Sequence, residues 1–175
     1  MKLVAIKGLL PGIHSPGETY FRRVNQAYVS TVDDIGPSFL YGGRFNPRNE
    51  FGVLYLSSSQ DCAYMERLRQ VKGRKEDLLP QTGAAFHVRI QKCLNLLNAD
   101  VLETLGISPG DLVRDSDFAV PQSVSREARN VGFEALLAPS AAGEEYSTLV
   151  VFKDKLSPPS FCALRQASVK PYPIS

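Results

Sequence analysis

The sequence has no tryptophan, two histidines and three cysteines, and it lacks several motifs that such residues form in enzymes. The cysteines Cys62, Cys93 and Cys162 are widely spaced and no Cys-x-x-Cys occurs, so neither a disulfide framework nor a zinc site is indicated. Neither H-E-x-x-H nor G-x-S-x-G is present, which leaves little support for a zincin or an α/β-hydrolase. We expect reduced thiols in a cytoplasmic protein.

Long apolar runs and a strong net charge are also missing. No apolar run approaches the ~20 residues that cross a bilayer. The apolar stretch near the N-terminus is short and lacks a clear cleavage site, so we expect no signal peptide. A net charge of +2 argues against a large nucleic-acid footprint. With 43% apolar and 22% charged residues, the 175-residue chain fits one globular domain, residues 1–175, with its own core.

Apolar periodicity predicts strands and helices in an irregular order. Buried or alternating segments predict strands at residues 19–25, 52–56, 84–91, 133–139 and 147–152. Helices are expected within residues 57–73 and 120–132, and a strand end with a short helix within residues 94–108. From residue 155 onward we expect a strand and a proline-bearing tail. Because β-α-β alternation is absent, the predicted class is α+β.

Two of these segments carry more detailed expectations. In residues 84–91, alternation places His87 opposite the apolar face, which favours a partly covered strand residue over a catalytic base. In the helix predicted within residues 57–73, Ser58 or Ser59 is the expected cap. Its apolar stripe is expected to include Cys62 and Met65.

The stretch GGRFNP, residues 42–47, places Arg44 directly after two glycines and before a turn. Glycine removes side chains where a ligand could approach the backbone. Arginine offers a planar fork of donors that suits phosphate or carboxylate. The alternative is a β-turn with a surface arginine.

Two further residues are candidates for the same site. Tyr55 lies within a short apolar strand, where its ring could form a stacking wall or simply fill the core. Glu66 lies at the flank of a helix stripe, so its carboxylate either faces a cleft or is a solvated charge. The run E-R-L-R makes local ion pairing the alternative for Glu66.

The ordered set is more specific than its members. Tyr55 follows Arg44 by eleven residues, Glu66 follows after another eleven, and LLAPSA comes about seventy residues later. This order resembles the RES-domain family, which is named for an arginine, a glutamate and a serine, over about residues 20–152. On this resemblance the family residues fall on Arg44, Tyr55, Glu66 and Ser140.

The resemblance leaves some positions open. The family has an early arginine, for which FRRV offers Arg23, with Arg22 as a shifted alternative. Phe45 stands where the family usually has tryptophan. Gln122 could match part of a Thr-Gln motif, and the asparagine that usually follows P-S-A is missing.

The resemblance implies a fold and an activity. The fold would be an ADP-ribosyltransferase-like core of two small packed β-sheets flanked by helices. The protein would be the toxin of a type II toxin–antitoxin system, with an Xre-type antitoxin as partner and NAD as substrate. NAD phosphorolysis to ADP-ribose-1-phosphate and nicotinamide, with inorganic phosphate as co-substrate, is favoured. Mono-ADP-ribosylation of a protein and an inactive dinucleotide-binding module remain alternatives, and the oligomeric state stays open.

The resemblance also implies a role for each residue. Arg44, Glu66 and Ser140 would be catalytic, and Arg23, Arg44, Tyr55 and Ser140 would bind NAD. The arginines suit the diphosphate, and a tyrosine ring suits the nicotinamide. Glu66 would stabilise the positive charge that develops on the ribose, and Ser140 would hydrogen-bond the nicotinamide or a phosphate. No metal or cofactor is required for this chemistry.

Overall fold

The computed structural model describes residues 1–9, 11 and 18–172. His14 and the end of the expected C-terminal tail lie outside this range. Eight strands are described: β1 (Glu18–Asn25), β2 (Leu54–Ser57), β3 (Gln81–Arg89), β4 (Cys93–Asn95), β5 (Ala135–Pro139), β6 (Ser147–Val151), β7 (Phe161–Leu164) and β8 (Lys170–Tyr172). The α-helices are α1 (Gly36–Tyr41), α2 (Gln60–Gln70), α3 (Ala99–Leu105), α4 (Pro109–Val113) and α5 (Ala119–Val131). Short 3₁₀ helices are η1 (Leu3–Gly8), η2 (Gln26–Thr31), η3 (Lys75–Asp77), η4 (Lys153–Lys155) and η5 (Gln166–Ser168).

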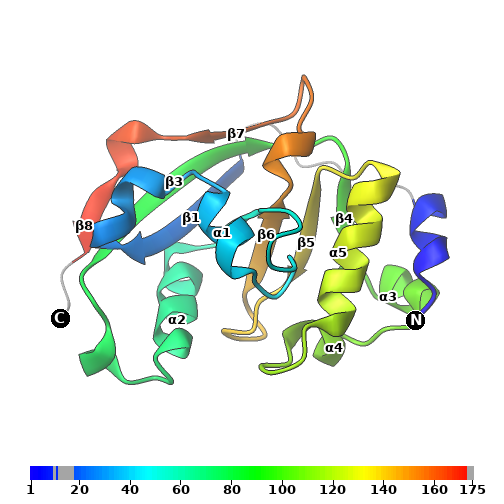
Figure 1. Cartoon of the computed structure of the whole chain (residues 1–175), viewed down its shortest axis with the longest axis horizontal. Helices are drawn as coiled ribbons and strands as arrows, with labels where there is room; N and C mark the ends of the chain where they lie inside the picture. The colour runs from blue at the N-terminus through cyan, green and yellow to red at the C-terminus, as the bar shows by residue number, and fades with distance from the viewer. Residues whose placement is uncertain (10, 12–17, 173–175) are drawn as a thin grey trace.

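The strands form one hydrogen-bonded sheet in the order β4-β5-β6-β2-β1-β3-β7, and β8 pairs with β3 beside β7 (Figure 1). The β4–β5 pair is parallel and the other pairs are antiparallel. This mixed arrangement of strands and helices confirms the expected α+β class.

The expected division into two sheets is correct for the packing but wrong for the hydrogen bonding. β1 and β2 pair at Phe21 and Ser57, and this narrow contact joins the β1-β3-β7 half of the sheet to the β4-β5-β6-β2 half. A core cluster contains residues of both halves, for example Phe86 of β3 and Leu56 of β2. The two halves therefore enclose a common core although the backbone ladder between them is continuous.

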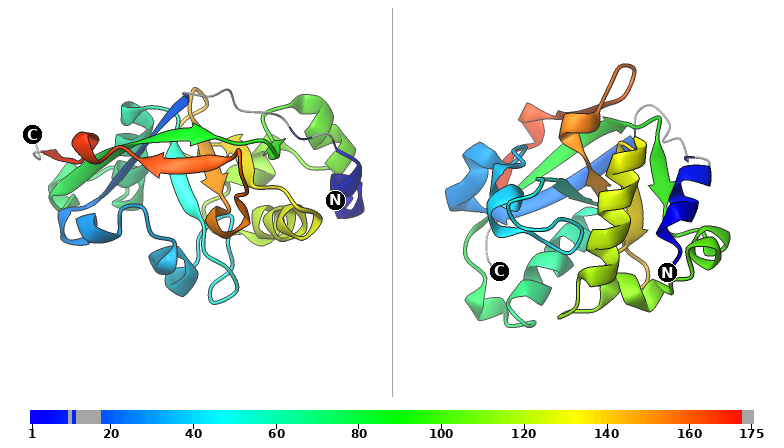
Figure 2. Two further views of the ribbon diagram at one scale, coloured as in Figure 1. Left: turned by 90° about the horizontal axis from the view of Figure 1, so that it is seen from above. Right: turned by 45° about the vertical axis from the view of Figure 1, so that its right-hand side comes forward.

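The other face of the β4-β5-β6-β2 half packs against α5. Val124 and Ala128 of α5 belong to one cluster with Leu136 of β5 and Val150 of β6. The helix ends at Gly132, whose φ of +99° suits glycine. The 3₁₀ helix η1 lies beside α5 and α3 (Figure 2, right).

α2 packs against β1 and β2. Ser59 caps it by accepting a hydrogen bond from the Cys62 N–H over 3.0 Å, as expected. Of the expected apolar stripe, Cys62 is buried but Met65 is only partly buried, and the other buried residue of α2 is Ala63. α2 also lines a polar cleft with Glu66, Arg67 and Arg69.

The long strand β3 confirms the alternation expected for residues 84–91. Phe86, Val88 and Ile90 are fully buried. His87 is partly buried on the other side, with its ring edge-on to Phe161 at a centroid distance of 5.1 Å. The strand expected after residue 155 is β7, but part of the expected tail forms a further strand, β8, and both run along β3 (Figures 1 and 2).

Candidate active site

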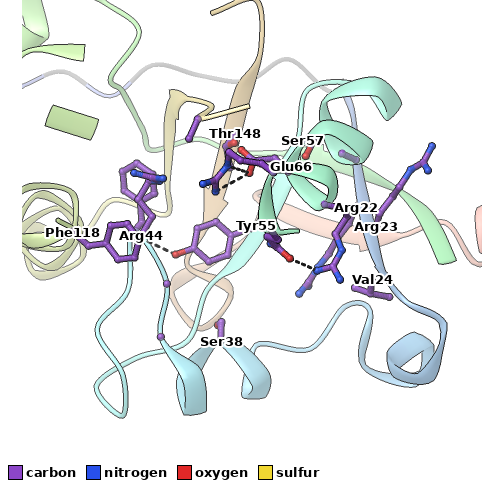
Figure 3. A pocket seen from close by; sticks show the side chains of 18 of the residues that line it. Arg22, Arg23, Val24, Ser38, Arg44, Tyr55, Ser57, Glu66, Phe118 and Thr148 are labelled. Carbon is purple, nitrogen blue, oxygen red and sulfur yellow. Dashed lines mark hydrogen bonds and ion pairs between the residues drawn. The ribbon is translucent and has the colours of Figure 1, made fainter. Parts of the chain in front are cut away.

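A cleft of about 390 Å³ opens on the sheet face between α2 and α5 (Figure 3). Its floor includes Tyr55 of β2 and Thr148 of β6, and the bend after α1 forms one wall. Its lining has a strong excess of positive charge. The charged side chains in this lining are Arg22, Arg23, Arg44, Arg67, Arg69 and Glu66. Such a cleft suits an anionic ligand.

The bend at residues 42–47 is built around the hydroxyl of Tyr55. This hydroxyl accepts a hydrogen bond from the Phe45 N–H and donates one to Asn46 Oδ1, each over 2.9 Å. A Cβ on Gly43 would lie 2.6 Å from the hydroxyl oxygen, and Gly42 has a φ of +70°. Both glycines line the cleft, where the lack of a side chain gives a ligand room. The bend itself also requires glycine at both positions, because Gly42 has a positive φ and a Cβ on Gly43 would clash with Tyr55.

Two amide side chains fix this bend to the rest of the fold. Asn46 is fully buried and its Nδ2 donates to the carbonyl oxygens of Ser38 (2.7 Å) and Phe51 (3.0 Å). Gln122 of α5 donates from Nε2 to the Gly43 carbonyl oxygen over 2.9 Å. The bend is therefore held from both sides before any ligand arrives.

Arg44 extends from the bend and is largely covered, with a side chain only 10% exposed. Its Nη1 donates to the carbonyl oxygens of Leu112, over 3.4 Å, and of Arg114. Its guanidinium carbon lies 5.0 Å from the centroid of the Phe118 ring. Burial, together with the nearby charge of Arg69, lowers the pKa of Arg44, but a guanidinium remains protonated at neutral pH. The alternative of an exposed turn arginine is wrong.

Glu66 lines the cleft, and the buried Ser140, whose neighbours Pro139 and Ala141 line the cleft, contacts it. The Ser140 hydroxyl donates a hydrogen bond to Glu66 Oε1 over 2.5 Å, and it accepts one from the Ala142 N–H over 3.0 Å. Arg69 donates to Glu66 Oε2 from Nε (3.3 Å) and Nη2 (3.2 Å). Glu66 therefore forms the local ion pair along α2 that the alternative interpretation predicted. The pair lies at the cleft, and it orients the Glu66 carboxylate.

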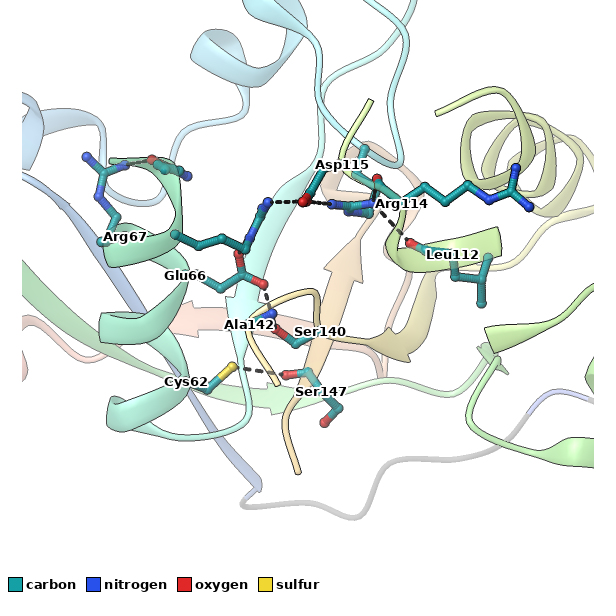
Figure 4. A network of polar contacts seen from close by, with 12 residues as sticks. Cys62, Glu66, Arg67, Leu112, Arg114, Asp115, Ser140, Ala142 and Ser147 are labelled. Atoms are coloured by element: carbon teal, nitrogen blue, oxygen red, sulfur yellow. Dashed lines mark hydrogen bonds and ion pairs between the residues drawn. The ribbon is translucent and has the colours of Figure 1, made fainter. Parts of the chain in front are cut away.

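This pairing continues through Asp115 to Arg44. Figure 4 shows Ser140, Glu66 and Asp115 of this network. Arg69 Nη1 lies 2.9 Å from Asp115 Oδ1, and Arg44 Nη2 lies 3.8 Å from the same oxygen. The polar chain thus runs from Ser140 through Glu66, Arg69 and Asp115 to Arg44, and it joins four segments that are far apart in sequence.

Tyr55 is both a core residue and part of the cleft wall. Its ring packs against the core cluster under α5 and also lines the cleft. Burial raises the pKa of its hydroxyl well above the usual value for tyrosine, so the hydroxyl stays protonated and keeps its two hydrogen bonds. The ring, rather than the hydroxyl, is the part available to a ligand.

Strand register separates the two candidate early arginines. Phe21 pairs with Ser57, so odd-numbered residues of β1 share a face with Tyr55 of β2. Arg23 lies on this face, which carries the cleft, and Arg22 on the opposite one. Both line the cleft, but the register favours Arg23 as the residue that faces α2.

The two guanidinium groups have different surroundings. Arg22 Nη1 donates to the Val32 carbonyl oxygen over 2.9 Å, and burial, together with the charge of Arg67, lowers the pKa of Arg22 to about 10. Arg23 lies between two rings, 4.0 Å from the Tyr172 centroid and 5.1 Å from that of Tyr64. Arg22 therefore serves the fold, and Arg23 is held by aromatic stacking at the cleft edge.

Several residues of the site were not found from the sequence. Arg69 carried a signal in its spacing of three residues from Glu66 on one helix. Asp115 and Phe118 had no local signal, because they reach Arg44 from a loop about seventy residues later. Arg67 was also missed, and it hydrogen-bonds Gln81 of β3 over 3.0 Å.

The described residues show neither a metal site nor a membrane span. In the ranges 1–9, 11 and 18–172, no three His, Cys, Asp or Glu side chains are grouped so that they could hold a metal ion. Among the same residues no helix has the length and apolar character that crossing a bilayer requires.

Comparisons with known proteins agree with this geometry. A probable NAD(+) phosphorylase of Mycobacterium tuberculosis is 31% identical over 111 residues, which cover 63% of this chain and 53% of the relative. The match thus spans about half the length of that relative. A crystal structure of the M. tuberculosis MbcT–MbcA toxin–antitoxin complex contains a similar chain, with a TM-score of 0.78 and 23% identity over 98% of this chain and 92% of that one. The RES domain model matches residues 20–172, and the chain therefore belongs to the RES domain family.

Proposed function

We propose that this protein is a toxin enzyme that consumes NAD in the cytoplasm by phosphorolysis, giving ADP-ribose-1-phosphate and nicotinamide. The observation that carries the proposal is the Ser140–Glu66–Arg69 chain of hydrogen bonds in a cleft that also holds Arg44 and Tyr55. The similarity to a probable NAD(+) phosphorylase of M. tuberculosis supports the same reaction.

The cleft supplies the groups that NAD binding needs. Arg44 and Arg23 are the arginines that face the cleft from the bend and from β1, and they suit the two phosphates of the dinucleotide. The Tyr55 ring forms an apolar wall between them, where a nicotinamide ring could stack. Because Asn46 and Phe45 fix the Tyr55 hydroxyl, this wall is rigid before the ligand binds.

Glu66 is placed to act on the reacting ribose. In phosphorolysis an oxygen of inorganic phosphate forms a bond to C1′ of the ribose while the bond from C1′ to the nicotinamide nitrogen breaks. Nicotinamide leaves with the bonding electrons, and positive charge develops on the sugar as the bond breaks. A carboxylate held by Ser140 and Arg69 can stabilise this charge without reorganising.

The proposed partner is an antitoxin of the Xre type. A similar chain forms a toxin–antitoxin complex in M. tuberculosis, and an enzyme that destroys NAD would need restraint in the cell that makes it. We expect the antitoxin to cover the cleft between α2 and α5, so that NAD and the antitoxin exclude each other.

The test is incubation of the purified protein with NAD, with and without inorganic phosphate, followed by separation of the products. We expect nicotinamide and ADP-ribose-1-phosphate in equal amounts, with a rate that depends on phosphate. Free ADP-ribose without phosphate dependence would indicate hydrolysis instead. Labelled ADP-ribose on an added protein acceptor would indicate mono-ADP-ribosylation. Intact NAD in all conditions would contradict an enzymatic function.

A further inference from the structure

The loop between α4 and α5 closes one side of the cleft over Arg44. The backbone carbonyl oxygens of Leu112, in the last turn of α4, and of Arg114, at the start of the loop, accept hydrogen bonds from Arg44 Nη1. Phe118, at the end of the loop, places its ring 5.0 Å from the Arg44 guanidinium carbon. One face and one nitrogen of Arg44 are therefore occupied by this loop.

The other terminal nitrogen of Arg44 is left without a hydrogen bond. Nη2 is buried and has no hydrogen-bond partner within the described part of the chain. Nη2 lies 3.8 Å from Asp115 Oδ1, which is too far for a hydrogen bond. A buried guanidinium nitrogen without a partner is costly, so the arrangement leaves a donor ready for another acceptor.

Asp115 holds Arg44 and Arg69 together by a single oxygen. Its Oδ1 contacts Arg69 Nη1 at 2.9 Å as well as Arg44. The Asp115 side chain is 80% exposed, whereas those of Arg44 and Arg69 are 10% and 33% exposed. An exposed carboxylate that pairs through one oxygen is weakly held, whereas Arg44 is also held by two backbone carbonyl oxygens and Arg69 by Glu66.

The other arginines of the cleft do not share this property. Arg67 directs its donors to Gln81, Gln70 and Asn25, all within the fold. Arg22 donates to a backbone carbonyl oxygen, and Arg23 is stacked between rings. Arg44 and Arg69 are therefore the pair whose common partner can leave into water.

We propose that Arg44 and Arg69 form a subsite for a phosphate group, and that Asp115 occupies it when no ligand is bound and leaves when the phosphate enters. A phosphate offers several charged oxygens, so it can accept from Arg44 Nη2 and from Arg69 Nη1 together, while Arg69 Nε and Nη2 stay on Glu66. Arg69 also holds Glu66, which places the bound phosphate beside the proposed reacting ribose.

This subsite rests on the proposed function for its location next to the reaction, and two sources of phosphate fit it. Inorganic phosphate would bind there as the attacking co-substrate, or the diphosphate of NAD would bind there as part of the substrate. The variants described below distinguish these two sources. If inorganic phosphate binds at the subsite, the KM for inorganic phosphate changes. If the diphosphate of NAD binds there, the KM for NAD changes.

The first variant is Asp115→Asn, which keeps the shape of the side chain and removes the competing charge. We expect the KM for one of the two phosphate-bearing ligands to fall about twofold to fivefold, the range set by the loss of one exposed ion pair. Asp117→Asn is the control, because Asp117 lies two residues away on the same loop and bonds the Ala119 N–H rather than an arginine. An equal effect of both variants, or no effect of Asp115→Asn, would overturn the proposal.

The second variant is Arg69→Gln, which should raise the same KM by about tenfold or more, since it removes a charged hydrogen-bond donor to phosphate. Arg126→Gln removes the same charge from a surface pair with Glu50 and should leave both KM values unchanged. If Arg69→Gln lowers kcat while neither KM rises, Arg69 only positions Glu66 and the subsite is wrong.

Calorimetry can measure how tightly inorganic phosphate and ADP-ribose bind to the same variants. Because this measurement does not require turnover of NAD, it tests the subsite separately from the proposed function. Tighter binding of either ligand to Asp115→Asn, and weaker binding to Arg69→Gln, would support the subsite even if the wild type left NAD intact. Unchanged binding of both ligands by both variants would overturn it even if NAD phosphorolysis were observed.

Discussion

The Ser140 hydroxyl lies 2.5 Å from Glu66 Oε1 and donates a hydrogen bond to it. Ser140 follows β5, and Glu66 lies on α2, so this contact joins the two sides of the cleft. Because Arg69 holds the other oxygen of the same carboxylate, Glu66 has a fixed orientation. A fixed carboxylate in a cationic cleft is what stabilisation of a developing ribose cation requires.

Arg44→Lys tests whether the buried guanidinium is needed as a fork. We expect NAD binding to weaken by about tenfold or more, because lysine keeps the charge but cannot make paired hydrogen bonds in a fixed plane. The measurement is the KM or Kd for NAD.

The matched control is Arg48→Lys in the same bend. Arg48 is exposed and does not line the cleft, so its replacement should be near neutral. Equal losses in the two variants would mean that the bend is a diffuse basic patch and that Arg44 has no special role.

Gly43→Ala should destabilise the protein by about 1–3 kcal/mol, because the new Cβ would lie 2.6 Å from the Tyr55 hydroxyl oxygen. Urea denaturation measures the change in the free energy of unfolding. Gly110→Ala is the control, since its Cβ would meet the nearest atom at 3.7 Å, an ordinary contact.

A double-mutant cycle identifies the cause of this loss. Tyr55→Phe removes the hydroxyl and should itself cost about 1–3 kcal/mol, because the buried Asn46 and the Phe45 N–H lose their partner. The Gly43→Ala, Tyr55→Phe double variant should be less destabilised than the sum of the single variants. Strict additivity would show that the contact with Tyr55 is not the reason for the glycine.

Tyr172→Ala tests whether the C-terminal strand β8 positions Arg23. The Tyr172 ring lies 4.0 Å from the Arg23 guanidinium carbon, and loss of a cation–π contact of this kind costs about 0.5–2 kcal/mol. We expect the KM for NAD to rise severalfold. Tyr172→Phe keeps the ring and should restore the wild-type KM, and a loss of the same size in both variants would argue against a positioning role.

Glu134 should make the protein less stable at acidic pH. It is buried, and although burial alone would raise its pKa, hydrogen bonds from Ser160 and from backbone N–H groups such as that of Lys92 lower it overall. A carboxyl with a depressed folded-state pKa stabilises the protein above its unfolded-state pKa of about 4.3, and this stabilisation is lost as pH falls through the folded-state pKa.

The corresponding variant is Glu134→Gln, measured by denaturation across pH 3–7. We expect the wild type to be more stable than the variant near neutral pH, and the difference to shrink as pH falls below about 4. Glu103→Gln is the control, because Glu103 is exposed on α3. A difference that is constant across the whole pH range would contradict the lowered pKa.

The sequence predicted the elements that have strong periodicity. The helix expected at residues 120–132 is α5, and the alternation of Phe86, Val88 and Ile90 is the buried face of β3. The short elements α1, α4 and β8 were missed, because three to six residues give too little pattern to distinguish a helix or strand from a turn. Their positions depend on the packing of the whole domain.

For the site, the order of residue types along the chain was informative. The contacts between residues far apart in the chain could not be predicted from the sequence. Of the four residues that the motif order singles out, Arg44, Tyr55 and Glu66 line one cleft, and Ser140 contacts Glu66. Their roles toward NAD stay a prediction. The contact of Arg44 with Asp115 joins residues 71 positions apart and depends on how a loop crosses the cleft, so no local pattern could indicate it.

The most direct test is the rate of phosphate-dependent NAD consumption by Glu66→Gln compared with the wild type. The amide is nearly isosteric, so the fold should persist, and the melting temperature serves as the control. Loss of the preorganised carboxylate should reduce kcat by about 10²-fold or more. A folded Glu66→Gln protein that consumes NAD at the wild-type rate would contradict the proposed role of Glu66 and, with it, the mechanism.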